Sequence, residues 1–135
     1  MDHQRAILII EDEQFLMDLY KKVFLQRGFN VLEAGDGLAG LEKLNSALVD
    51  MVLLDIMLPK MDGISVLRKL KGENSLAKEV PVFMLTNLGQ ESVIKEALKI
   101  GADGYILKSK YLPDQVADEI EKFLREKEEA KTQSS

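Results

Sequence analysis

Residues 49–59 read VDMVLLDIMLP and set one carboxylate, Asp55, in the most apolar segment of the chain. The apolar run Met51–Leu54 precedes it, and three more apolar residues separate it from Pro59. Short, continuous apolar runs are typical of strands buried on both faces, as in a parallel sheet. Because a carboxylate is costly to bury without partners, we expect Asp55 to stand at the open end of this strand rather than in the core.

The same pattern repeats along the chain, where short apolar runs alternate with longer segments whose apolar residues recur every three or four positions. The runs predict strands at Ala6–Ile10, Val31–Leu32, Met51–Leu54, Val80–Leu85 and Tyr105–Leu107. The longer segments predict helices over Leu16–Phe24, Leu38–Leu48, Ile64–Leu70, Val93–Leu98 and Leu112–Leu124, with Leu48 facing inward. Strands that alternate with helices indicate an α/β fold, in which a doubly wound parallel sheet is covered on both faces.

Length and composition restrict the classes of function. The 135 residues suit one domain, which we place at residues 1–127, followed by a charged tail at 128–135 that we expect to fray. The net charge of −5 argues against direct nucleic-acid binding, and no apolar run approaches the ~18–20 residues of a membrane span. There is no cysteine and one histidine, His3, so carboxylates, hydroxyls and lysines remain as nucleophiles. We expect a cytoplasmic protein.

Polar residues follow four of the predicted strands: Glu11 and Asp12 the first, Asp55 the third, Thr86 the fourth and Lys108 the fifth. In the doubly wound order 2-1-3-4-5 the first and third strands are neighbours, so the three carboxylates share one crevice at the carboxyl edge. Carboxylates so close together repel, and Mg²⁺, or alternatively Mn²⁺, would resolve the repulsion with oxygen ligands. A phosphoryl group placed there would meet the metal on one side and Lys108 on the other, with Asp55 as the nucleophile.

Each of these residues taken singly has an ordinary structural explanation. Asp12 could cap the helix that follows it, Thr86 could simply end a strand, and Lys108 could be a surface lysine. Their joint placement at the ends of neighbouring strands favours a site.

The chain resembles the receiver domain of two-component response regulators. The resemblance is carried by ILIIEDE at the first strand, LLDIMLPKMDG around Asp55, MLTN at Thr86 and GADGYILKS around Lys108, and it spans Ala6–Leu124. It implies a single flavodoxin-like sheet in the order 2-1-3-4-5. It also implies that Asp55 accepts a phosphoryl group from a sensor histidine kinase or a phosphotransfer protein, and that the Thr86 hydroxyl and Lys108 ammonium hold that group.

The resemblance further implies a metal site and a switch. Glu11, Asp12, Asp55 and the backbone carbonyl of Met57 are the implied Mg²⁺ ligands. Tyr105 is expected to turn inward on activation and to change the face formed by the predicted helix Val93–Leu98, the strand Tyr105–Leu107 and the last helix, Leu112–Leu124. This face would act on a downstream protein or output domain, and it could form a dimer. The chain is then a signalling switch rather than an enzyme, with no nucleic-acid or membrane partner of its own.

Two positions, Glu11 and Ser109, depart from the usual pattern of the family, and two others, Met57 and Leu88, bear on loss of the phosphoryl group. Glu11 stands where many members have aspartate; because its side chain is longer by a methylene, we expect Asp12 to bind metal directly and Glu11 to act through water. Ser109 replaces the proline that often follows the lysine, and a cis peptide without proline costs ~3–4 kcal/mol, which favours a trans peptide and a differently placed loop. Met57 and Leu88 are apolar where the family positions a hydrolytic water, so we predict slow self-dephosphorylation.

Four alternative functions fit parts of the sequence less well. Residues 35–40, GDGLAG, match the dinucleotide fingerprint G-x-G-x-x-G, but they follow the second strand, an edge strand in this order, so a glycine-rich turn is favoured. An aspartate-nucleophile phosphatase would resemble D-x-D, which Asp55-Ile56-Met57 lacks. A flavin-binding module needs a phosphate loop after the first strand, where acids stand here. A degenerate receiver would keep the fold and only bind partners.

Overall fold

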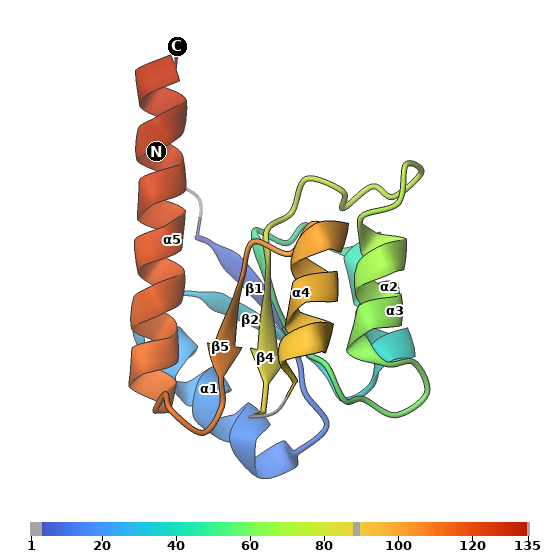
Figure 1. Ribbon diagram of the computed structural model, residues 1–135. Helices are drawn as coiled ribbons and strands as arrows, with labels where there is room; N and C mark the ends of the chain where they lie inside the picture. Colours follow the sequence, from blue (N-terminus) through green and yellow to red (C-terminus); the bar gives the residue numbers. More distant parts are fainter. Residues whose placement is uncertain (1–3, 88–89, 135) are drawn as a thin grey trace.

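The computed structural model describes residues 4–87 and 90–134 and contains five parallel strands and five helices (Figure 1). The strands are β1 (Ala6–Ile10), β2 (Asn30–Ala34), β3 (Met51–Asp55), β4 (Val82–Thr86) and β5 (Gly104–Leu107). The helices are α1 (Gln14–Gln26), α2 (Gly37–Ser46), α3 (Gly63–Leu70), α4 (Glu91–Ile100) and α5 (Pro113–Ser134). The strands pair in the order β2-β1-β3-β4-β5, which confirms the predicted sheet.

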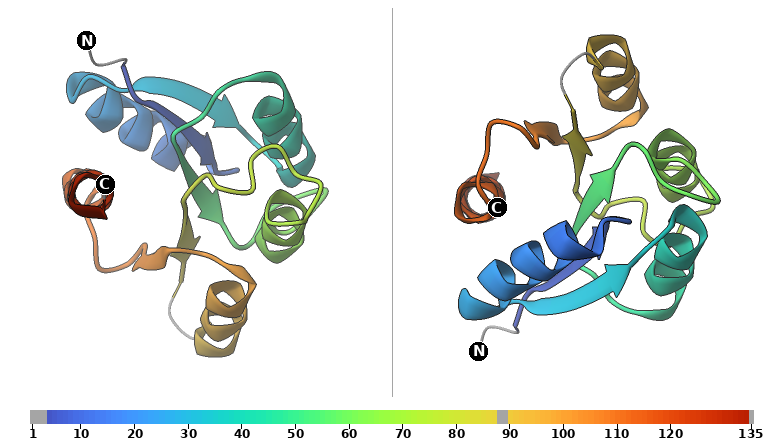
Figure 2. Two further views of the ribbon diagram at one scale, coloured as in Figure 1. Left: turned by 90° about the horizontal axis from the view of Figure 1, so that it is seen from above. Right: turned by 90° about the horizontal axis from the view of Figure 1, so that it is seen from below.

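The sheet separates two layers of helices, with α1 and α5 on one face and α2, α3 and α4 on the other (Figure 2). Side chains alternate along a strand, so β1 serves both cores. Ile7 and Ile9 pack in the cluster that includes α1 and α5 side chains, and Leu8 and Ile10 pack in the cluster on the opposite face. All four are fully buried, as the continuous apolar run predicted.

The inward-facing position Leu48 and the helix start at Leu112 were predicted wrongly, and both residues lie just outside a helix. Leu48 was placed on the inner face of the second helix, but α2 ends at Ser46 and Leu48 is 96% exposed. The backbone is already extended at Ala47, so helical spacing no longer determines where Leu48 points. Leu112 is 68% exposed because α5 begins only at Pro113, a residue suited to the first helical position.

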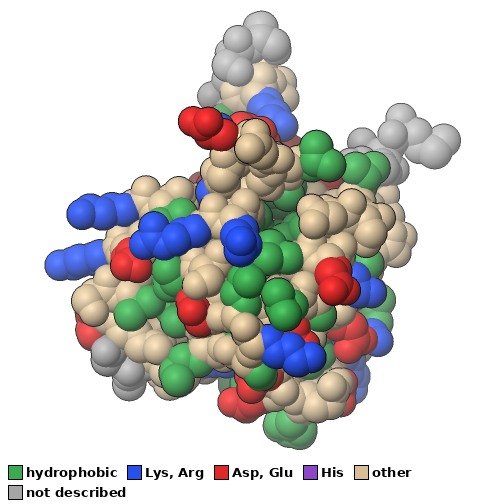
Figure 3. All heavy atoms as spheres, turned by 90° about the vertical axis from the view of Figure 1, so that its right-hand side faces the viewer, with side chains coloured by type: hydrophobic (Ala, Val, Ile, Leu, Met, Phe, Trp, Pro, Cys, Tyr) green, Lys and Arg blue, Asp and Glu red, His purple; other side chains and the backbone are tan. Residues whose placement is uncertain are grey.

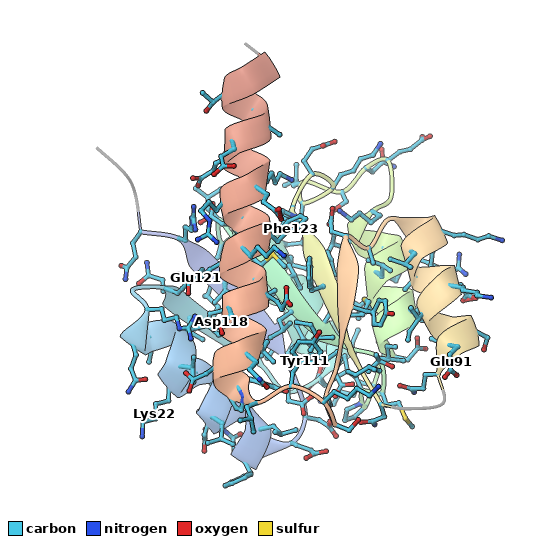
Figure 4. All side chains as sticks on the ribbon, turned by 60° about the vertical axis from the view of Figure 1, so that its left-hand side comes forward. Lys22, Glu91, Tyr111, Asp118, Glu121 and Phe123 are labelled. Atoms are coloured by element: carbon cyan, nitrogen blue, oxygen red, sulfur yellow. The ribbon has the colours of Figure 1, made fainter. Side chains whose placement is uncertain are left out.

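Helix α5 continues to Ser134, through the segment 128–134 where a frayed tail was expected, and projects past the edge of the sheet (Figure 1). Ion pairs hold it to the rest of the domain. Arg27, at the end of α1, donates to Asp118 at 2.7 Å and to Glu121 at 2.6 Å, both on α5 (Figure 4), and Arg5 pairs with Glu128. In the described part of the chain, no helix combines the length and apolar character needed to cross a membrane.

Candidate metal and phosphoryl site

The carboxyl ends of β1 and β3 bring together the three predicted acids. The two strands are direct neighbours, with Ile10 opposite Leu54, so the next residues, Glu11 and Asp55, lie side by side. Carboxylate oxygens of Glu11, Asp12 and Asp55 all lie within 4.8 Å of one another. Asp12 is exposed, whereas Glu11 and Asp55 are 1% and 4% exposed. Asp55 does end its strand, but it is much less accessible than an open strand end suggested.

Lys108 reaches the same cluster from the end of β5. Its Nζ lies 2.6 Å from Asp55 Oδ2 and 2.9 and 3.0 Å from the two oxygens of Glu11. The described peptide bonds are all trans, including the one before Ser109, so the ammonium reaches Asp55 without a cis bond. Burial alone would lower the pKa of Lys108, but its hydrogen bonds to Asp55 and Glu11 raise it above the ordinary value, and the side chain is charged at neutral pH.

The acidic side chains of the cluster outnumber its one basic side chain, Lys108. Three carboxylates face one ammonium, and two of those carboxylates are buried. Burial, together with the neighbouring Asp55, raises the pKa of Glu11 to about 8, although Lys108 acts in the opposite direction. An all-oxygen donor set with an excess of negative charge fits Mg²⁺ or Mn²⁺, hard cations that prefer carboxylate and carbonyl ligands. Glu11, Asp12 and Asp55 would hold the ion.

The loop after β3 folds back tightly over Asp55. The backbone N–H of Met57 donates to Asp55 Oδ1 at 3.2 Å, so the Met57 backbone lies beside the carboxylate while its side chain is 64% exposed. Gly63 makes the fold possible, because a Cβ there would lie 2.1 Å from the carbonyl oxygen of Asp55. The Gly63 N–H instead donates to the Ile56 carbonyl at 2.7 Å. The predicted Met57 carbonyl ligand therefore belongs to a segment that is close to the metal site.

Lys108 contacts the acids directly, whereas the two predicted switch residues, Thr86 and Tyr105, are placed differently. Thr86 ends β4 and is 1% exposed, and its hydroxyl donates to Gln90 Oε1 at 2.5 Å. Tyr105 lies on the edge strand β5 and is 47% exposed. The role of Gln90 was not predicted from the sequence. Gln90 is the N-cap of α4, and its side chain accepts the Asn87 N–H from three residues further along, the same spacing that a Gln uses in a capping box.

The glycine-rich segment 35–40 has a packing explanation. A Cβ on Gly37 would lie 2.0 Å from the Met61 carbonyl oxygen, and one on Gly40 would lie 2.5 Å from Ile10 Cδ1. The Asp36 carboxylate already accepts the Ala39 N–H at 2.8 Å and caps α2. Since β2 is an edge strand, the segment lies away from the point where the strand order reverses, which argues against dinucleotide binding.

Five parallel strands in this order, flanked by five helices, define a flavodoxin-like domain of the CheY type. The family model for the response regulator receiver domain matches residues 7–121, and the chain belongs to that family. Receiver domains are switches of two-component signalling, where they work with histidine kinases and output domains, and they are generally not classed as enzymes.

Known relatives differ in how much of their length the chain spans. It is 37% identical over 121 residues to the phosphate regulon transcriptional regulatory protein PhoB of Escherichia coli, covering 90% of this chain and 52% of PhoB. It is 34% identical over 119 residues to the chemotaxis protein CheY of Bacillus subtilis, covering 87% of this chain and 96% of CheY. A CheY-like receiver domain protein from Methanospirillum hungatei has a TM-score of 0.86 at 28% identity, covering 95% of this chain and 99% of that one. The chain thus spans about half of PhoB and nearly all of CheY.

Proposed function

We propose that this receiver domain accepts a phosphoryl group on Asp55, in a Mg²⁺-dependent transfer from a histidine kinase or a phosphotransfer protein. The observation that carries the proposal is the contact of Lys108 Nζ with Asp55 Oδ2 at 2.6 Å, next to carboxylates that lie within 4.8 Å of one another. A nucleophile, a cation for the phosphoryl oxygens and a set of metal ligands are then in one place, as phosphoryl transfer requires.

In the transfer, an oxygen of the Asp55 carboxylate forms a bond to phosphorus while the bond from phosphorus to the donor imidazole nitrogen breaks. The imidazole leaves with the electron pair and takes a proton from water. Lys108 moves from the carboxylate oxygen to a phosphoryl oxygen, and the Thr86 hydroxyl donates to another. A Mg²⁺ ion held at this site would supply charge that neutralises the phosphoryl group. Glu11, Asp12 and the Met57 carbonyl would hold the ion together with Asp55.

The added group carries a charge of about −1.5 to −2 and three acceptor oxygens. We propose that Thr86 moves toward it, that Tyr105, now 47% exposed on β5, turns inward, and that the face formed by α4, β5 and α5 is reshaped. A separate protein, an attached output domain or a second copy of the domain would recognise this face. We propose that this signalling takes place in the cytoplasm.

We propose no direct nucleic-acid contact for this domain. Its net charge is −5, and on the side shown in Figure 3 lysine and arginine side chains are interspersed with acids. Arg68, for example, pairs with Glu96 across α3 and α4 at 3.3 Å.

We also propose slow loss of the phosphoryl group, because the exposed Met57 side chain cannot hydrogen-bond a hydrolytic water. Leu88, the second residue of that prediction, lies outside the described residues.

The test is the intact mass of the protein after incubation with acetyl phosphate and Mg²⁺, beside an Asp55→Asn variant and a sample treated with a chelator. We expect one added phosphoryl group in the wild type and none in either control. A wild-type protein that binds Mg²⁺ but gains no mass would contradict the proposal and favour a degenerate receiver that only binds partners.

A further inference from the structure

The side chain of Gln90, directly before α4, holds two groups of the segment that follows β4. Its Oε1 accepts the Thr86 hydroxyl at 2.5 Å and the backbone N–H of Asn87 at 2.8 Å. Thr86 is buried, Gln90 is half-buried and Asn87 is exposed. The amide of Gln90 therefore fixes the orientation of a buried hydroxyl from the side of α4.

The two contacts determine which atom donates the proton. A backbone N–H can only donate, so the Gln90 atom that faces Asn87 must be the oxygen and not the nitrogen of the amide. Thr86 Oγ1 contacts this same oxygen, so the threonine hydroxyl must supply the proton between them. Its second acceptor, the Asn87 carbonyl at 3.2 Å, lies in the same segment and uses the same proton. The single hydroxyl proton of Thr86 is thus engaged away from any phosphoryl oxygen.

Resting on the proposed function, in which Thr86 donates to a phosphoryl group on Asp55, we propose that Gln90 is a positioning residue that holds Thr86 in its unphosphorylated arrangement. Gln90 Oε1 and a phosphoryl oxygen compete for one proton. The bond to the charged phosphoryl group is the stronger of the two and draws Thr86 away, while the Asn87 bond to Gln90 can persist. Gln90 therefore lowers the population of the active arrangement before phosphorylation.

The expected size of the effect follows from one neutral hydrogen bond. Loss of such a bond shifts an equilibrium by about two- to tenfold, and the apparent rate of a reaction that needs the minor arrangement changes by up to the same factor. Gln90→Ala removes the acceptor, so it should speed phosphorylation by that factor. Gln90→Glu keeps an oxygen acceptor and makes it charged, so it should hold Thr86 at least as firmly as the wild type.

The experiment measures the rate of phosphorylation by acetyl phosphate with Mg²⁺, followed by intact mass. The expected order of rates is Gln90→Ala faster than the wild type, and Gln90→Glu equal to it or slower. Ser92→Ala, a change of an exposed residue in the first turn of α4, is the control and should match the wild type. A Gln90→Ala protein that is phosphorylated no faster than the wild type would overturn the proposal.

A double-mutant cycle tests the contact without any phosphoryl donor. Unfolding equilibria are measured for the wild type, Gln90→Ala, Thr86→Val and the double variant. Each variant is compared by the factor by which it changes the equilibrium constant of unfolding. If Gln90 acts through Thr86, the factor caused by Gln90→Ala should be about two- to tenfold smaller when Thr86 is already valine. An equal factor in both backgrounds would mean that Gln90 acts only through Asn87, and the proposal fails. If the wild type accepts no phosphoryl group, the proposed function fails, but this cycle still decides whether Gln90 holds Thr86.

Discussion

The stability of the metal-free protein should depend on pH through one buried side chain, Glu11. Desolvation by burial, together with the neighbouring Asp55 carboxylate, raises the pKa of Glu11 from 4.5 to about 8 in the folded state. In the unfolded chain this carboxyl regains its ordinary pKa. Between these two pKa values the folded protein therefore binds one proton more than the unfolded chain does.

The sign of the effect follows from this difference in bound protons. The free energy of unfolding falls as pH rises through the window from 4.5 to about 8, and it becomes constant above it. One proton corresponds to a slope of at most about 1.4 kcal/mol per pH unit. Between pH 5.5 and 7.5 the protein should therefore lose on the order of 2–3 kcal/mol of stability. If Mg²⁺ occupies the proposed site, it would bind the ionised carboxylates, so it should reduce the slope and stabilise the protein most at high pH.

The assay is urea unfolding at several pH values in the presence of a chelator, for the wild type and for Glu11→Gln. The variant carries a neutral side chain of the same shape, so we expect it to lack the slope and to be the more stable protein above pH 7. Glu42→Gln makes the same change on an exposed position of α2 and should keep the wild-type slope. A flat or rising wild-type profile, or an unchanged slope in Glu11→Gln, would refute the reasoning.

Three further changes have defined outcomes. Gly63→Ala puts a Cβ 2.1 Å from the Asp55 carbonyl oxygen, so the loop must move; we expect a loss of about 1–3 kcal/mol in unfolding free energy and of most phosphorylation, whereas Gly35→Ala, with nothing within 4 Å of the new Cβ, should change neither. Arg27→Ala removes the ion pairs between α1 and α5 and should lower the unfolding free energy by about 1 kcal/mol or less, with a smaller loss at 1 M salt; an equal loss at both salt concentrations would point to packing instead. Leu48→Ser, at a 96% exposed position, should leave the urea midpoint within the error of the wild type, and a clear decrease would show that this side chain packs.

The sequence alone determined the elements and the edge of the sheet where the site lies. Continuous apolar runs such as Ile7–Ile10 favour burial on both faces, and a parallel sheet between two helical layers provides it. Once the strands are parallel, the residues that follow them meet at one edge whatever the loops do. This is why the sequence alone predicts that Glu11, Asp55 and Lys108 lie together. Periodicity failed where a helix ended before the apolar pattern did, as at Leu48 beyond Ser46.

Only the tertiary structure decided how those side chains are paired. Lys108 and Glu11 are 97 positions apart, and no local pattern records that their charged groups meet. The buried state of Asp55, the acceptance of the Thr86 proton by Gln90 and the close approach of the loop to Gly63 likewise depend on loop conformation and on rotamers chosen in a packed environment. Spacing along the chain reports which face an element buries. Hydrogen-bond partners are set by distances of a few tenths of an ångström between distant segments, and these exist only after the chain has folded.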